Sequence, residues 1–204
     1  MPDSHVNYLA LAKDAQDLLF RAAHTPNAYT DEPVTEEHLR AVYDLIQWGP
    51  TSMNQQPLRV VEVRSPEKRA AVVEAMMAGN KPKTQAAPVV LVFAADKDFH
   101  ENLTTQFPAN PGAREMFDGL GREGRDASAR LNAALSLAYW IVGVRAAGLA
   151  IGPMTGFDVE AVDRELFPDG RHTALVVATI GYADPESFYP RGPRLVYGEV
   201  VTSV

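Results

Sequence analysis

The chain has 204 residues, with 19 Lys and Arg against 26 Asp and Glu for a formal net charge of −7, and it contains no cysteine. This length fits one domain, which we expect to span residues 1–204. The missing cysteine excludes disulfides, thiolate nucleophiles and Cys-ligated metal centres. Basic residues are scattered without a basic run, which argues against nucleic-acid binding. With neither a signal-peptide pattern nor an apolar run of ~20 residues, the sequence predicts a cytoplasmic protein without a membrane partner.

In chain order, apolar residues at helical spacing first predict a helix over about 8–22. A second amphipathic helix is expected after Thr35, a residue type that caps helices, and it should end at Gly49 and Pro50. The short β-branched stretch 58–64 is typical of a strand.

The middle of the chain alternates again between helix and strand signals. Ser65 and the proline that follows it predict a helix that runs to Gly79. The continuously apolar stretch 88–96 predicts a central strand covered on both faces. Residues 97–126 carry Pro, Gly and alternating charge, and we expect a long excursion with at most a short helix that covers the functional site.

The C-terminal part begins with the longest predicted helix, over 128–148, which is apolar nearly all round and must be buried in the core or against another subunit. A short helix near 158–166 and a buried strand at 173–184 follow. The remaining tail is proline-broken extended chain. No internal repeat or linker divides the sequence.

The sequence does not support three familiar classes of motif. The stretch "GLGREG" at 119–124 matches the dinucleotide pattern G-x-G-x-x-G, but no apolar strand precedes it, so a flexible loop is the better interpretation. The five histidines show no metal-ligand spacing, and we expect no metal. Ser-His-Asp catalysis lacks a G-x-S-x-G elbow.

What remains is a set of small polar segments that interrupt the helices and strands. They supply amides, hydroxyls, close-approach glycines and two arginines, without a thiol or an acid–base pair. That inventory suits a large planar heterocycle with a phosphate tail, in which the cofactor performs the chemistry. The segments are "HTPN" at 24–27, "GPTSMNQQP" at 49–57, "GNKPKT" at 79–84, "GPMTGFD" at 152–158 and "PRGPR" at 190–194.

In this order and spacing the segments resemble the FMN-dependent nitroreductase superfamily, most closely its short branch of malonic semialdehyde reductases and related NAD(P)H oxidoreductases. The resemblance covers roughly 18–195, and "GPTSMNQQP" and "GLAIGPMTGFD" are its most specific carriers. It implies an α+β sandwich in which helices flank a central mixed sheet. It also implies an intertwined homodimer with two FMN sites at the subunit interface.

The resemblance also assigns cofactor contacts residue by residue, with no catalytic side chain because flavin N5 carries the chemistry. The first motif, around "HTPN" at 24–27, would hold the ribityl chain, the phosphate or the pyrimidine side of the flavin. The 51–54 loop would reach FMN, commonly from the other subunit, and the 152–156 segment would lie beside the reactive ring. The implied residues are His24, Thr25, Asn27, Thr51, Ser52, Asn54, Asn80, Lys83, Pro153, Met154, Thr155, Gly156, Arg191 and Arg194.

One departure concerns charge. Many family members carry Arg or Lys in the first motif, where this chain has Ala23, His24 and Asn27. A cation near flavin N1 and O2 stabilises the reduced, anionic flavin. The sequence leaves open whether Arg21, just upstream, takes that place.

The resemblance implies a ping-pong reductase in which NADH or NADPH reduces FMN, and a small acceptor such as malonic semialdehyde is then reduced at the same place. Broad nitro, quinone or enone reduction is the alternative acceptor range. Two other classes stay open: a flavin-binding carrier or sensor without turnover, and a cofactor-free interaction domain. The sequence does not distinguish NADH from NADPH.

Overall fold

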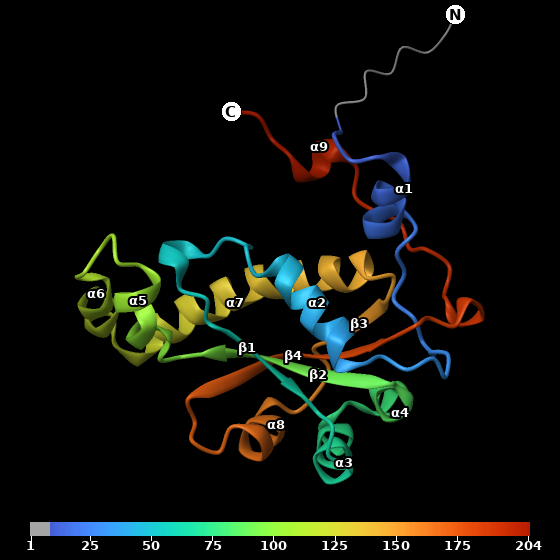
Figure 1. Ribbon diagram of the computed structural model, residues 1–204, viewed down its shortest axis with the longest axis horizontal. Coiled ribbons are helices and arrows are strands. Elements are labelled where there is room, and N and C mark those ends of the chain that lie inside the picture. The colour runs from blue at the N-terminus through green and yellow to red at the C-terminus, as the bar shows by residue number, and fades with distance from the viewer. Residues whose placement is uncertain (1–8) are drawn as a thin grey trace, which may run out of the picture.

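The structure is a computed structural model that describes residues 9–204, in which helices cover both faces of one four-stranded sheet (Figure 1). The sheet order is β1-β2-β4-β3, and all three pairings are antiparallel. The expected mixed sheet is therefore corrected to an antiparallel one in the described range. The strands are β1 (Leu58–Glu62), β2 (Val89–Asp96), β3 (Ala150–Met154) and β4 (His172–Gly181).

Helices form two layers, because the sheet is apolar on both faces and each face must be covered. In Figure 1, α2 and α7 lie above the sheet, α3, α4 and α8 lie below it, and α5 and α6 lie at one end. The α-helices are α1 (Lys13–Gln16), α2 (Glu36–Ile46), α3 (Pro66–Ala75), α4 (Lys81–Ala86), α5 (Leu103–Gln106), α6 (Ala113–Gly119), α7 (Gly121–Ala146), α8 (Val159–Leu166) and α9 (Tyr197–Val200). Short 3-10 or π segments are Asp17–Arg21, Ser52–Asn54, Ala78–Asn80, Phe99–Asn102 and Pro185–Ser187.

Local sequence signals explain several boundaries. The Ser65 hydroxyl accepts a hydrogen bond from the Lys68 backbone N–H (3.4 Å), as expected of the residue that caps α3. Asp158 caps α8 in the same way, through the Ala161 N–H (3.0 Å). Every residue of β2 is buried, so the prediction of a strand covered on both faces is confirmed.

Other boundaries differ from expectation. The predicted helix over 8–22, whose first residue lies outside the described range, is only the short α1 followed by a π-helical turn. The helix expected to reach Gly79 ends at Ala75. The "LAIGPM" stretch, which had no predicted structure, is the edge strand β3. No helix in the described range is both long and apolar enough for a bilayer crossing.

The stretch 97–126 differs most from expectation. It contains α5, α6 and the start of α7, and "GLGREG" lies at the α6–α7 junction rather than in a loop. The cause is a separate hydrophobic core cluster at this end of the molecule, in which Phe99, Leu103, Ala113 and Phe117 pack against α7 residues such as Ala129. Burial of these apolar side chains fixes the helices despite the charged residues between them.

Candidate functional site

Around β3, the structure brings the first motif against the "GPM" segment. A side chain at Gly152 would lie 2.7 Å from the Thr179 hydroxyl oxygen and 3.7 Å from the Thr25 methyl carbon. The Tyr29 hydroxyl donates to the Thr179 hydroxyl oxygen (2.6 Å), and burial raises the pKa of Tyr29 to about 12. A glycine at 152 thus lets the segment before α2 pack directly on the sheet edge.

The polar segment at 79–84, which leads into α4, reaches the same edge of the sheet. The Asn80 side-chain amide donates to the Gly156 carbonyl (3.1 Å), which also accepts from the Met77 backbone N–H (2.9 Å). A side chain at Gly156 would lie 2.8 Å from the Asn80 amide nitrogen, so only glycine fits without displacement. The turn after β3 is therefore held at two points, while the Pro153 and Thr155 side chains beside it are exposed.

The C-terminal tail contacts the first motif, so it joins the polar segments that meet near β3. The Asn27 side-chain amide donates to the Ser187 carbonyl (2.9 Å), and the Arg191 guanidinium donates to the Ala23 carbonyl (2.8 Å). His24 packs on Phe188 with ring centroids 4.9 Å apart. Segments about 160 residues apart in sequence thus meet at one end of the sheet.

The "GPTSMNQQP" loop is anchored elsewhere, on the first half of α7 and on α5. The Ser52 N–H donates to the buried Asn132 side-chain oxygen (2.7 Å), and the Ser128 hydroxyl donates to the buried Gln55 side-chain oxygen (3.0 Å). The Asn54 side-chain amide donates to the Gln106 carbonyl (2.8 Å). Gln55 is therefore a structural anchor.

The same loop carries local backbone strain. Met53, Asn54 and Gln56 have φ values of 50°, 52° and 44°, in the left-handed region that favours glycine. Such conformations cost about 1–3 kcal/mol each and persist where the surroundings hold them. The contacts with Asn132 and Gln106 supply that support.

Within one chain, this loop and the β3 group are far apart. The loop precedes β1, and β1 and β3 are opposite edges of the sheet, which places them about 14 Å apart at the usual strand spacing. Along α7, Asn132 at the loop and Arg145 near the first motif are separated by about 20 Å. One chain therefore does not bring all the predicted residues to one place.

Several predicted residues already have other partners. The Met154 side chain is buried in the core below the sheet, so only its backbone is available to a ligand. The Thr51 hydroxyl oxygen accepts from the Gln56 N–H (3.2 Å), and Arg194 donates to the Gly192 and Pro193 carbonyls (3.0 Å each). Lys83 is half-buried on α4.

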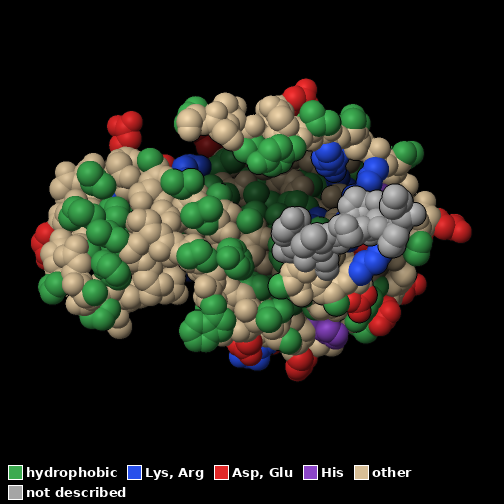
Figure 2. All heavy atoms as spheres, turned by 90° about the horizontal axis from the view of Figure 1, so that it is seen from above, with side chains coloured by type: hydrophobic (Ala, Val, Ile, Leu, Met, Phe, Trp, Pro, Cys, Tyr) green, Lys and Arg blue, Asp and Glu red, His purple; other side chains and the backbone are tan. Residues whose placement is uncertain are grey.

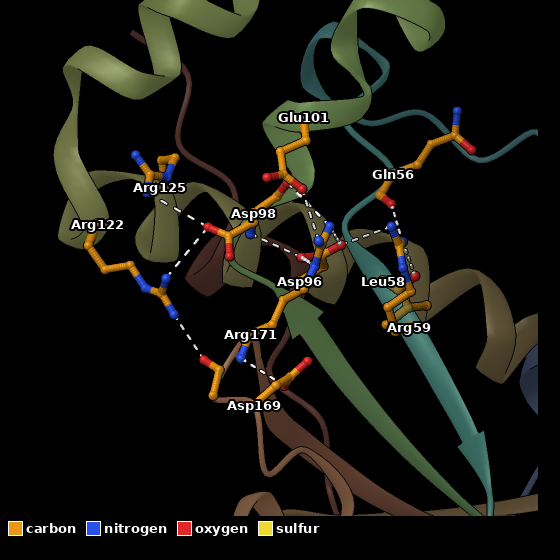
Figure 3. A network of polar contacts seen from close by, with 11 residues as sticks. Gln56, Leu58, Arg59, Asp96, Asp98, Glu101, Arg122, Arg125, Asp169 and Arg171 are labelled. Carbon is orange, nitrogen blue, oxygen red and sulfur yellow. Dashed lines mark hydrogen bonds and ion pairs between the residues drawn. The ribbon is translucent and has the colours of Figure 1, made fainter.

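An ion network around the buried Asp96 carboxylate lies at the opposite end of the sheet (Figure 3). Arg171 forms a bidentate pair with Asp96 (2.8 and 2.9 Å), and Arg59 adds a third contact (3.0 Å). Burial by itself would raise the pKa of Asp96. The hydrogen bonds from Arg171 and the Asp98 N–H, with the charges of both arginines, lower it below the ordinary value instead. Arg122 and Arg125, both within the 97–126 stretch, join this network through Asp98.

Two cavities flank the predicted residues. One of about 450 Å³ lies between α2, β1 and α7, where Tyr43, Trp140, Gln56, Arg59 and Gln106 line it. The other, of about 160 Å³, is lined by residues that include Ala23, His24, Arg145, Gly148 and Phe188. Figure 2, seen from above, shows a hollow with hydrophobic side chains in its floor and Lys and Arg side chains on its rim.

Sequence reasoning missed Asn132, Ser128 and Gln106, which hold the loop, and Arg145, which lines the smaller cavity. They lie within stretches assigned to a helix or an excursion, and no local motif marks them. In the described range, no group of three or more His, Asp or Glu side chains is arranged to hold a metal ion.

Solved structures share this fold. A provisionally named nitroreductase of Bacillus subtilis is 24% identical, with a TM-score of 0.82 over 91% of this chain and 97% of that chain. Another, from Exiguobacterium sibiricum and solved in complex with FMN, is 17% identical, with a TM-score of 0.80 over 95% of this chain and 98% of that chain. The fold is thus the α+β nitroreductase fold.

Sequence comparisons agree. The model of the nitroreductase family matches residues 21–182. A relative from Streptomyces coelicolor, provisionally named an NADH dehydrogenase/NAD(P)H nitroreductase, is 55% identical over 96% of this chain and 99% of its own length. A similarly named relative from Xanthomonas oryzae is 45% identical over 91% of this chain and 93% of its own length. The chain belongs to the nitroreductase family, whose enzymes are FMN-dependent oxidoreductases.

Proposed function

We propose that this chain is a cytoplasmic, single-domain FMN-dependent NAD(P)H oxidoreductase that works as a homodimer and reduces a small acceptor. The observation that carries the proposal is the meeting of four of the five polar segments at the β3 edge. There Asn80 binds the Gly156 carbonyl, Thr25 lies beside Gly152, and Arg191 binds the first-motif backbone at Ala23.

The proposed contacts follow the order of the segments along that edge. The first motif and the tail would hold the ribityl and phosphate part, through His24, Thr25, Asn27, Arg191 and Arg194. The α4 and β3 segments would hold the ring, through Asn80, Lys83, Pro153, Thr155, Gly156 and the Met154 backbone. Exposed or half-buried hydroxyl and amide groups beside cationic groups at one end fit a neutral ring with an anionic tail.

Bound FMN would supply the hydride-transfer chemistry between NAD(P)H and the acceptor. The chain's own contribution is position and electrostatics. Because the Gly156 carbonyl is held by Asn80 and Met77, the backbone of the turn after β3 is fixed, and its N–H groups would donate to the cofactor without first being ordered. By fixing the cofactor, the chain would also align the hydride donor and the hydride acceptor with it, so that a bimolecular encounter is replaced by reaction within one complex.

The dimer is proposed because of distance and unpartnered apolar surface. Thr51, Ser52 and Asn54 are too far from β3 of their own chain, so we assign them to the partner's FMN. The α5–α6 segment is bound to that loop through Gln106 and would cover the same partner site. Apolar side chains left exposed on α7 and in the tail give the partner a surface: Leu131, Leu135, Tyr139, Leu195, Val196, Tyr197 and Val200.

Three observations bear on the class of acceptor. Lys83, half-buried three residues after Asn80, would pair with the carboxylate of a small semialdehyde such as malonic semialdehyde. The names of the relatives favour nitro compounds instead. An enone reductase with the same fold, 18% identical, adds enones to the acceptors to test. Quinones belong to the same broad alternative that the sequence left open.

The test is the visible spectrum of the purified protein, followed by anaerobic titration with NADH and NADPH. We expect bound FMN whose absorbance is bleached by one or both donors, and steady turnover with at least one member of an acceptor panel of semialdehyde, nitroaromatic, quinone and enone. A protein that binds no FMN after reconstitution is a cofactor-free domain, and one that binds FMN without turnover is a carrier or sensor. Either result would contradict the proposal.

A further inference from the structure

The smaller cavity lies where the end of α7 meets the first motif and the tail. Its walls include His24 and Phe188, which stack on each other, and the Arg145 side chain from the last turn of α7. Its volume is about 160 Å³. The cavity is therefore small, partly aromatic and bordered by a cation.

Arg145 lines this cavity, and a second guanidinium group, that of Arg191, binds the backbone of another residue that lines it. Arg145 donates to the Leu19 carbonyl (3.1 Å), and Arg191 donates to the carbonyl of Ala23, another cavity residue. Burial lowers the pKa of Arg145, and the positive charge of Arg191 lowers it further. The two groups therefore repel each other in a partly desolvated place.

Neither arginine has an acidic partner within 4.0 Å among residues 9–204, and each donates only to backbone carbonyls. Arg21, by contrast, pairs with Asp17 (3.1 Å), and Arg171 pairs with Asp96 (2.8 Å). Two guanidinium groups at neighbouring backbone positions, with N–H donors beyond those bonds, are suited to a phosphate, which accepts bidentate hydrogen bonds.

We propose that Arg145 is a further cofactor-binding residue, which together with Arg191 holds the phosphate of FMN at this cavity. The inference rests on the proposed function and deepens it. It also places a positive charge beside the first motif, because residues 22–27 contain no Lys or Arg and Arg145 lines the same cavity as Ala23 and His24. That cation comes from the last turn of α7, since Arg21 is already paired with Asp17.

A purely structural role has to be separated from this one. A cation in the last turn of a helix is favoured by the helix dipole, and the bond to Leu19 ties the 17–21 turn to α7. Those effects act on the fold whatever ligand is bound. Riboflavin provides the distinction, because it has the same ring and ribityl chain as FMN but no phosphate.

The experiment compares FMN and riboflavin affinity of the apo-protein by flavin fluorescence for wild type, Arg145→Gln and Arg145→Lys. We expect wild type to prefer FMN. Arg145→Gln should weaken FMN binding about 10–100-fold while riboflavin affinity stays within about 2-fold, because a charge-assisted contact to phosphate is lost. Arg145→Lys should show a smaller loss and keeps the test usable if the Gln variant does not fold. Arg164→Gln, an exposed site on α8, is the matched control and should change neither affinity.

Each other outcome has a defined meaning. An equal loss for both flavins would show that Arg145 only orders the fold, and unchanged FMN affinity in both Arg145 variants would likewise overturn the inference. Wild type that binds riboflavin as tightly as FMN would also overturn it. Wild type that binds neither flavin would overturn the proposed function itself, which is a different result from failure of the variant alone.

Discussion

At the scale of single residues, the polar loop before β1 depends on a buried amide in α7. Asn132 is 3% exposed, accepts from the Ser52 N–H and donates to the Ser128 carbonyl (2.9 Å). Replacement by alanine leaves the Ser52 N–H without this partner and opens a small void. We expect Asn132→Ala to lower the free energy of unfolding by about 1–3 kcal/mol in urea denaturation.

If the loop also reaches the partner's FMN, the same variant should weaken FMN affinity. The control is Gln85→Ala, which removes an exposed amide on α4 and should change the free energy of unfolding by no more than about 0.5 kcal/mol. Equal stabilities of the two variants would contradict the anchoring role of Asn132.

A second residue-scale prediction concerns acid. Because the pKa of Asp96 is lowered in the folded state, its ion network stabilises the protein above the unfolded-state pKa of about 3.9 and loses that contribution as the pH falls through the lower folded-state value. Arg59 and Arg171 are both about one-third exposed, so their desolvation is incomplete. We expect Asp96→Asn to cost roughly 1–3 kcal/mol at pH 7 and to flatten the decline of stability below pH 4.

Urea denaturation at pH 3, 4, 5 and 7 measures both effects. Asp44→Asn, at an exposed position on α2, is the control and should follow wild type. A steep acid decline that persists unchanged in Asp96→Asn would assign the acid sensitivity to other carboxylates.

At the scale of elements, the crossing of α2 and α7 is set by one glycine. A side chain at Gly143 would lie 2.4 Å from the Ile46 γ2 carbon and 3.2 Å from the Val42 γ1 carbon. Gly143→Ala should therefore lower the free energy of unfolding by about 1–3 kcal/mol, which exceeds the gain in helix propensity of about 1 kcal/mol.

Gly119→Ala in α6 provides the comparison, since nothing lies within 4 Å of the added carbon. That variant should be unchanged or up to about 1 kcal/mol more stable in the same denaturation experiment. A Gly143→Ala protein as stable as Gly119→Ala would show that the two helices are free to move apart.

The elements also show where local sequence information ends. Apolar spacing and capping residues gave β2, α2 and α8 close to their observed bounds. The edge strand β3 was missed because "AIGPM" contains a glycine and a proline, which are disfavoured in strands, and its pairing with β4 overrides that preference. α7 begins at Gly121, seven residues before the predicted start at 128. Its first turns are supported by packing against α6, where Phe117 belongs to the same core cluster as Ala129, and the local sequence does not show that contact.

At the scale of the whole molecule, one face of α7 is apolar and exposed. Leu131, Leu135 and Tyr139 follow one another at four-residue spacing and are 64%, 47% and 43% exposed. If this stripe contacts the partner, the double variant Leu131→Glu, Leu135→Glu should be monomeric in sedimentation velocity. It should also lose most of its FMN affinity, because Thr51, Ser52 and Asn54 of the partner are then absent.

Circular dichroism should remain that of the wild type, since neither leucine is in the buried core. Val159→Glu places the same charge at an exposed apolar site on α8, across the sheet from α7, and should leave the dimer intact. A double variant that stays dimeric would place the interface elsewhere. A wild type that is monomeric at micromolar concentration would contradict the dimer itself.

The sequence by itself determined the family, the apolar central strand and the set of polar segments, because these depend on residue type and short spacing. Only the tertiary structure decided which segments meet. The strand order puts β1 and β3 on opposite edges, which separates "GPTSMNQQP" from "GPMTGFD" within one chain. Arg145 lines the same cavity as Ala23 and His24 only because α7 ends beside the first motif. Such contacts join residues tens of positions apart through packing of side chains on a common sheet, and no local pattern encodes them.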